Sequence, residues 1–291
     1  MPKAKKPSRE ALFRARQTEA SLQAAAFKRR FFKPGIRVLG VSGSARDRHD
    51  MSQEDSTTEW LLGKCLDEAK KLGAETKLVQ LRKYDIRPCK ACYSTTNTQC
   101  HFPCSCYPKG EAGDDMTNKL YDMCLQADVI ILATPVNNFK ISSYMALFVD
   151  RLISMDGSLS PADPNDPKNR ALNIAHTKFV AANGGLKFGS GFLRRFTGKV
   201  GGMIITGHEA GAAMAISQLF MTFNHFGVLF PPFSNMYATN TPCGHTHEDK
   251  RKLQISCHEN EARILAKNLI TAGKVLKRKN DYWWTYDGGI N

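Results

Sequence analysis

Long apolar runs are missing from this chain of 291 residues. A transmembrane helix needs about 18 or more consecutive apolar residues, whereas runs such as 129–133 have only the length of a buried strand. The basic N-terminal segment also lacks the apolar core of a secretory signal,. No internal repeat is evident. We therefore expect a globular chain with neither a membrane span nor a secretory leader.

Acidic residues are scarce, with 27 Asp and Glu against 41 Lys and Arg, for a formal net charge of +14. The excess lies at the two ends. Residues 1–33 hold ten basic and two acidic residues, and residues 250–279 hold nine and two. Since residues 280–291 contribute −2, only +1 remains for residues 34–249. A nucleic-acid protein more often spreads basic residues over a folded binding face, so we predict no nucleic-acid partner.

The nine cysteines cannot all pair within one chain. An odd number without a secretory signal indicates a reducing compartment, and we predict a cytoplasmic protein. The alternative is an organelle transit peptide, because the N-terminal segment is rich in Arg and poor in acidic residues,. Five cysteines fall between residues 89 and 106, a density that suits metal or redox chemistry better than disulfides.

Apolar runs of strand length alternate with segments of helical periodicity through five rounds. Predicted strands lie at 36–41, 75–81, 128–135 and 200–206, and a fifth starts at 228–230 and continues at 234–238. Predicted helices lie at 56–69, 115–127, 142–154, 210–226 and 248–279,. Runs without polar alternation indicate strands buried on both faces. The pattern therefore predicts an α/β fold with a doubly wound, mainly parallel sheet.

Three parts are predicted along the chain. A basic helical arm occupies residues 1–35, the α/β domain spans 36–245, and a C-terminal helix and tail fill 246–291. Within the domain we expect a cysteine-rich insert at 86–110. We also expect a glycine-containing segment at 156–198 to cover the site as a lid,.

Ligands of such sheets bind beyond the carboxyl ends of the strands, which here are followed by the loops 42–58, 134–142 and 207–213. The first loop combines hydroxyls, an arginine and a helix start, which together can hold a phosphate; its candidate residues are Ser42, Ser44, Arg46, Ser56, Thr57 and Thr58. It is neither a Walker loop nor a dinucleotide fingerprint, because the required glycine spacing is absent. The alternative is an ordinary polar loop with a good helix cap.

Four pieces of the chain, in this order, resemble the flavodoxin-like NAD(P)H-dependent FMN reductase superfamily, especially its iron–sulfur flavoprotein branch. They are GVSGSAR with TTEWLL, IRPCKAC, ADVIILATPVNNF with MALFVDRL, and GKVGGMIITGHEAGAAMAISQL, which span roughly residues 36–240. The resemblance implies a flavodoxin-like five-stranded sheet in the order 2-1-3-4-5. It also implies FMN as the cofactor.

Carried over by position, the resemblance assigns a role to each loop. Phosphate contacts are implied for Ser42, Ser44, Arg46, Thr57 and Thr58, ring contacts for Pro135, Val136, Asn137, Asn138 and Phe139, and the closing loop for Gly207, His208, Glu209 and Gly211. Two features depart from the family. The first loop carries a charged insert at 47–55, and Asn137 stands where an aromatic residue is common.

The cysteine-rich insert has the spacing Cys89-x2-Cys92-x7-Cys100-x3-Cys104-x-Cys106. Closely spaced thiolates suit an iron–sulfur cluster or a structural zinc ion. The resembling iron–sulfur flavoproteins carry a more compact motif, with the third cysteine soon after the second. The sequence therefore leaves three alternatives, which are a cluster, zinc, and free or redox-active thiols.

From these features we predict an FMN-dependent NAD(P)H oxidoreductase that passes electrons to a quinone, a flavin or a metal centre. His208 is the candidate partner of the ring or the nicotinamide. We expect a homodimer built by the basic arm and the C-terminal helix. Two alternatives are an iron–sulfur flavoprotein electron carrier without hydride chemistry, and a flavin-free interaction protein on the same fold.

Overall fold

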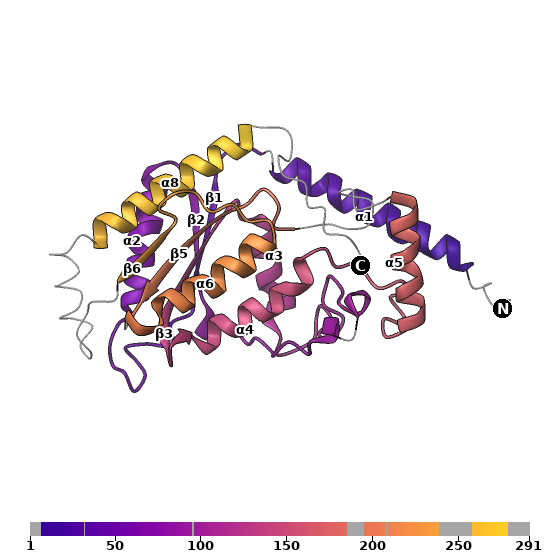
Figure 1. Cartoon of the computed structure of the whole chain (residues 1–291), viewed down its shortest axis with the longest axis horizontal. Coiled ribbons are helices and arrows are strands. Elements are labelled where there is room, and N and C mark those ends of the chain that lie inside the picture. The colour runs from indigo at the N-terminus through magenta and orange to yellow at the C-terminus, as the bar shows by residue number, and fades with distance from the viewer. Residues whose placement is uncertain are drawn as a thin grey trace.

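The computed structural model describes residues 7–31, 33–94, 96–184, 195–207, 209–238 and 258–278. Its sheet contains five parallel strands in the spatial order β2-β1-β3-β5-β6 (Figure 1). These strands are β1 (Arg37–Ser42), β2 (Glu75–Gln80), β3 (Val129–Asn137), β5 (Val200–Thr206) and β6 (Asn235–Ala238). The chain winds in one direction from β1 to β2 and in the other from β3 onward, so β1 and β3 flank the switch point.

The predicted order 2-1-3-4-5 is confirmed for the parallel strands. In chain numbering it becomes 2-1-3-5-6, because a short strand, β4 (Lys140–Ile141), pairs antiparallel with β3. The two-residue turn before β4 has positive φ angles at Asn138 (49°) and Phe139 (64°). Such a turn matches the twist of a hairpin and usually carries glycine. The sequence has no glycine there, which is why β4 was not predicted.

Helices cover both faces of the sheet (Figure 1). α2 (Thr57–Lys71) and α8 (His258–Arg278) pack on one face. α3 (Tyr121–Gln126), α4 (Ser143–Arg151) and α6 (Glu209–His225) pack on the other. The predicted C-terminal helix is therefore present over the residues of α8, and its predicted first turns, 248–257, lie outside the described residues.

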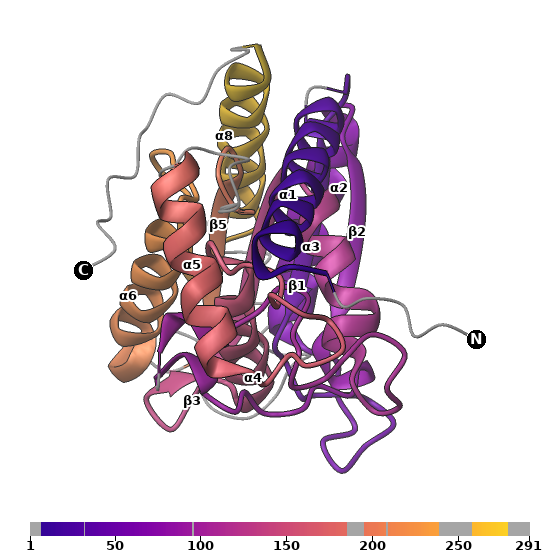
Figure 2. The ribbon, with the colours of Figure 1, turned by 90° about the vertical axis from the view of Figure 1, so that its right-hand side faces the viewer.

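Two further helices, α1 (Arg9–Phe31) and α5 (Arg170–Gly184), lie outside these layers and pack against each other (Figure 2). Phe13 is the buried anchor of α1, and its ring stacks on His176 of α5 with 5.1 Å between centroids. The predicted arm is therefore a helix that packs on its own chain. α5 falls within the segment predicted to act as a lid, and that role stays a prediction.

Short turns replace regular elements in the segment between β2 and α3. They are η1 (Leu81–Lys83), η2 (Cys92–Ser94), η3 (Asn97–Gln99) and the π-helical turn η4 (Met116–Leu120); a further turn, η5 (Leu152–Met155), follows α4. Among the described residues, no helix is both long enough and apolar enough to cross a membrane.

Candidate flavin site

The three predicted loops meet at the carboxyl edge of the sheet. Because β1, β3 and β5 are neighbours, their ends lie side by side, with Ser42 opposite Ala133 and Pro135 opposite Thr206. The amide of Gly43 donates to the carbonyl of Ala133 at 2.8 Å. The first and third loops also touch, since the hydroxyls of Thr58 and Thr206 are 2.6 Å apart. The topology thus brings together residues that the sequence separates widely.

The first loop is held by hydrogen bonds among its own serines. The hydroxyl of Ser42 donates to Glu59 Oε1 at 3.0 Å and accepts from the amide of Ser44 at 3.2 Å. The hydroxyl of Ser44 accepts from the amide of Arg46 at 3.2 Å. In this arrangement Ser42 shapes the loop. Ser44 still has its hydroxyl proton to donate to an anion.

The start of α2 supplies the other half of an anion site. Ser56 caps the helix, and its hydroxyl accepts from the amide of Glu59 at 3.2 Å, which is one of the two bonds of the predicted capping box; the Glu59 carboxylate bonds Ser42 and Gln80,. The amides of Thr57 and Thr58 occupy the first helical turn, where N–H groups have no partner inside the helix. A phosphate at this position would meet both the N–H groups and the positive end of the helix dipole.

A clamp of charged residues, not predicted from the sequence, supports this loop. Arg82 follows β2, is 11% exposed, donates to Asp47 at 3.1 Å and forms an ion pair with Glu59. The backbone N–H of His49 and then the guanidinium of Arg82 hold the pKa of Asp47 below its usual value. Gln80 donates to Glu59 at 2.7 Å. The clamp therefore fixes the start of the charged insert to the end of β2.

In the first loop, arginines face acidic residues of the insert. Arg48 donates to Asp55 at 2.8 Å, and Arg46 pairs with Glu54 at 3.4 Å. Arg46 is the arginine predicted to hold a phosphate, and its side chain is 40% exposed. An incoming phosphate would therefore compete with the Glu54 carboxylate for this guanidinium.

The second loop is the hairpin of β3 and β4. Pro135 and Val136 are half-buried, whereas Asn137, Asn138 and Phe139 are exposed. Phe139 is 64% exposed although its backbone is in the left-handed region, which costs a bulky residue about 1–3 kcal/mol. Such strain is concentrated at ligand sites. The hairpin therefore presents apolar and amide groups beside the anion site.

The third loop closes against this hairpin. Gly207 has a φ of +116°, and a Cβ on Gly211, in the first turn of α6, would lie 2.4 Å from Cγ1 of Val136 and 2.8 Å from Cα of Phe139. Only glycine permits this approach. His208 and the side chain of Glu209 lie outside the described residues, so the predicted role of His208 stays untested.

These three loops suit the two chemical parts of FMN. Ser44, Arg46 and the start of α2 offer hydrogen-bond donors and positive charge for a phosphate,. The half-buried Pro135 and Val136 offer an apolar edge for a flat ring,. The two surfaces adjoin because β1 and β3 are paired.

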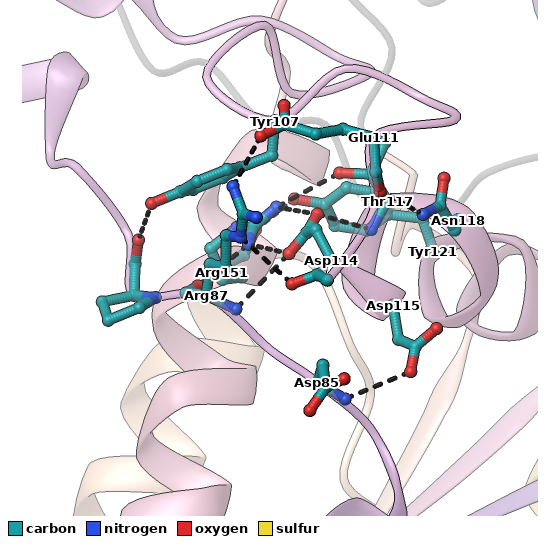
Figure 3. Close-up of polar contacts among 12 residues, drawn as sticks. Asp85, Arg87, Tyr107, Glu111, Asp114, Asp115, Thr117, Asn118, Tyr121 and Arg151 are labelled. Carbon is teal, nitrogen blue, oxygen red and sulfur yellow. Dashed lines mark hydrogen bonds and ion pairs between the residues drawn. The ribbon is translucent and has the colours of Figure 1, made fainter.

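The cysteine-rich segment lies on a buried ion pair between Arg151, at the end of α4, and Asp114 (Figure 3). The two guanidinium–carboxylate hydrogen bonds measure 2.6 and 3.0 Å, and both side chains are at most 1% exposed. Arg151 also donates to the carbonyl of Arg87 at 2.9 Å and lies 4.5 Å from the ring centroid of Tyr107. Burial would raise the pKa of Asp114, but hydrogen bonds from Arg151 and Thr117 hold it below its usual value.

The cysteines themselves contact one another in pairs. The neighbouring Cys100 is the main cause that raises the pKa of Cys92 to about 11, and Cys92 in turn lowers the pKa of Cys100. In the described ranges, no three His, Cys, Asp or Glu side chains are arranged to hold a metal ion. The described geometry therefore gives no support to the predicted cluster or zinc site at Cys89, Cys92, Cys100, Cys104 and Cys106.

A doubly wound parallel sheet with an anion site and an apolar hairpin at its switch point defines the flavodoxin-like class of proteins. A sequence model of one family within this class, described as NADPH-dependent FMN reductase, matches residues 36–241. The chain belongs to this family. It is accordingly a flavin-dependent oxidoreductase with FMN as its cofactor.

The sequence identity between this chain and individual relatives is low. An iron–sulfur flavoprotein of Archaeoglobus fulgidus is 28% identical over 206 residues, which cover 70% of this chain and 78% of the relative. An iron–sulfur flavoprotein of Methanosarcina thermophila is 28% identical over 118 residues, covering 40% of this chain and 53% of the relative. Among solved structures, RosB with bound 8-demethyl-8-formylriboflavin-5'-phosphate superposes with a TM-score of 0.58 at 18% identity. That match covers 85% of this chain and 82% of RosB, and it supports the fold alone.

Proposed function

We propose that this chain oxidises a nicotinamide dinucleotide, NADH or NADPH, and transfers the electrons to a small-molecule or protein acceptor such as a quinone, a second flavin or a metal centre. When bound, FMN supplies the ring that takes the hydride at N5 and releases the electrons to the acceptor. One observation carries the proposal, namely that the anion site at the start of α2 adjoins the β3–β4 hairpin at the switch point.

The residues of the chain would act by binding and orientation. Ser44, Arg46 and the amides of Thr57 and Thr58 would hold the phosphate and so fix the position of the ring. The backbone of 135–139 would lie along the ring, where its N–H and C=O groups tune the electronics of the flavin. The close contact of Gly211 with the hairpin would hold that backbone in place.

The cofactor assignment is tested by titrating the purified protein with FMN while its absorbance and fluorescence are recorded. We expect a saturable complex, and Arg46→Ala should weaken it about 10- to 100-fold, because charge-assisted hydrogen bonds contribute about 1.5–3 kcal/mol. The matched control is Arg48→Ala, which removes a second arginine of the same loop, one that pairs with Asp55. A colourless protein that fails to bind added FMN would refute the proposal.

The reaction is tested by following NADH and NADPH oxidation by the FMN-loaded protein with quinone, free flavin and ferric acceptors. Turnover at a steady rate supports the reductase. Loaded protein that exchanges electrons with a chemical donor, yet oxidises neither nicotinamide, supports the alternative of a pure electron carrier. Light scattering, with and without residues 1–33, tests the predicted homodimer.

The curated relatives are named iron–sulfur flavoproteins, but the described cysteines do not fit a cluster. We therefore derive no electron-transfer step through such a group. Analysis of iron and acid-labile sulfide in protein purified without air tests this point.

A further inference from the structure

Four thiols that the proposed function does not use lie next to one another in the cysteine-rich segment. The thiol of Cys106 donates to the sulfur of Cys92, with 3.9 Å between the two sulfur atoms. Cys100 and Cys104 lie near this pair, since both perturb the pKa of Cys92 and Cys104 also perturbs the pKa of Cys106. The direct thiol–thiol contact therefore joins Cys92 and Cys106.

A contact between two thiols suits a different chemistry from a metal site. A metal ion needs three or four ligand atoms that converge on one point, and the described part of the chain offers no such group. A disulfide needs only two sulfur atoms, about 2.05 Å apart when bonded. The contact at 3.9 Å is therefore within reach of a covalent bond after a modest rotation of the two side chains.

The exposure of the thiols agrees with the choice of this pair. Cys92 and Cys106 are both partly exposed, so a small reagent can reach either sulfur. Cys100 is only 7% exposed, and Cys104 packs against the hydrophobic core. The neighbouring Cys104 lowers the pKa of Cys106, but Cys92 and burial outweigh this effect and leave that pKa above its usual value,.

Hydrogen bonds from Tyr107 and Arg151 hold the backbone near the two cysteines (Figure 3). The hydroxyl of Tyr107 donates to the carbonyl of Pro88 at 2.9 Å, and Arg151 donates to the neighbouring carbonyl of Arg87 at 2.9 Å. These bonds tie the chain just after Cys106 to the chain just before Cys92. The two thiols are therefore held together by buried contacts in which neither of them takes part.

We propose that Cys92 and Cys106 form a reversible dithiol–disulfide site whose co-reactant is a low-molecular-weight disulfide such as glutathione disulfide. The Cys106 thiolate attacks one sulfur of the small disulfide, forms a mixed disulfide and expels one thiolate. The sulfur of Cys92 then attacks Cys106, forms the protein disulfide and expels the second thiolate. In sum, two protein thiols are oxidised to one S–S bond, and their two electrons and two protons pass to the small disulfide, which is reduced to two thiols.

The test uses the full chain, reduced, freed of reductant without air and equilibrated with glutathione buffers of increasing oxidised fraction. After alkylation, trypsin releases residues 91–109 as one peptide, because Lys90 and Lys109 bound it. Its mass reports how many of its four cysteines were alkylated. We expect oxidising buffers to leave two of the four joined to each other, and reduced glutathione to restore all four.

Single substitutions identify the pair. Cys92→Ser and Cys106→Ser should each abolish the internal link, whereas the matched control Cys104→Ser should keep it. Circular dichroism checks that each variant folds, and chymotryptic cleavage after Tyr93 locates the link in the unaltered chain. A link that survives Cys106→Ser, no link in any buffer, a stable glutathione adduct as the end product, or stoichiometric zinc or iron on the reduced protein would each overturn the proposal.

Discussion

Replacement of Gly211 by alanine tests whether α6 closes on the flavin hairpin. The new Cβ would lie 2.4 Å from Cγ1 of Val136 and 2.8 Å from the backbone of Phe139. The valine methyl can rotate away, but the Phe139 backbone cannot, so the hairpin must move. Overpacking of this kind costs about 1–3 kcal/mol, and alanine recovers up to about 1 kcal/mol of helix propensity. We expect a net loss of about 1–2 kcal/mol in the free energy of unfolding.

The matched control is Gly63→Ala in α2, where the added methyl would meet no atom within 4 Å. At this position only the helix propensity changes, and we expect the free energy of unfolding to rise by up to about 1 kcal/mol. Urea denaturation of the FMN-free proteins measures both effects, and an FMN titration should show weaker binding for Gly211→Ala alone. Equal stability and equal affinity of the two variants would refute the close contact between α6 and the hairpin.

Three further perturbations probe other parts of the molecule. Glu54→Gln should tighten FMN binding by about two- to fivefold, because the Glu54 carboxylate competes with the phosphate for Arg46 and an exposed ion pair contributes at most about 1 kcal/mol. Weaker binding of FMN by this variant would argue against a phosphate at Arg46. Arg151→Met should lower the free energy of unfolding by about 3–5 kcal/mol, since it leaves the Asp114 carboxylate buried and unpaired,. A loss below about 1 kcal/mol, measured by urea denaturation, would contradict this prediction. Burial, above all, lowers the pKa of His176 to about 4, so between pH 6.5 and 4 the unfolded chain binds a proton that the folded chain does not. The free energy of unfolding should therefore fall by about 2 kcal/mol from pH 7.5 to 5 on account of this group. His176→Phe should remove that part of the fall, and an unchanged pH dependence would exclude His176 as its source.

The local sequence determined the elements of the sheet and the edge at which the site lies. The unbroken apolar run at 129–133 predicted β3, and Ser56 with Glu59 predicted the start of α2. Both signals depend on residues within a few positions of each other, so they act before the chain is folded. Parallel strands then place their carboxyl ends at one edge, which is why three separate loops could be predicted to meet.

The polar partners at that edge were decided by the tertiary structure alone. The hydroxyl of Ser42 is bonded to Glu59, and Arg82 joins Asp47 to Glu59 across 35 and 23 positions of sequence. The cysteine spacing likewise admitted a cluster, zinc or free thiols, and the fold of the segment over the Arg151–Asp114 pair placed Cys92 beside Cys106. No local pattern encodes such contacts, because a hydrogen bond between distant residues depends on the path of the whole chain between them.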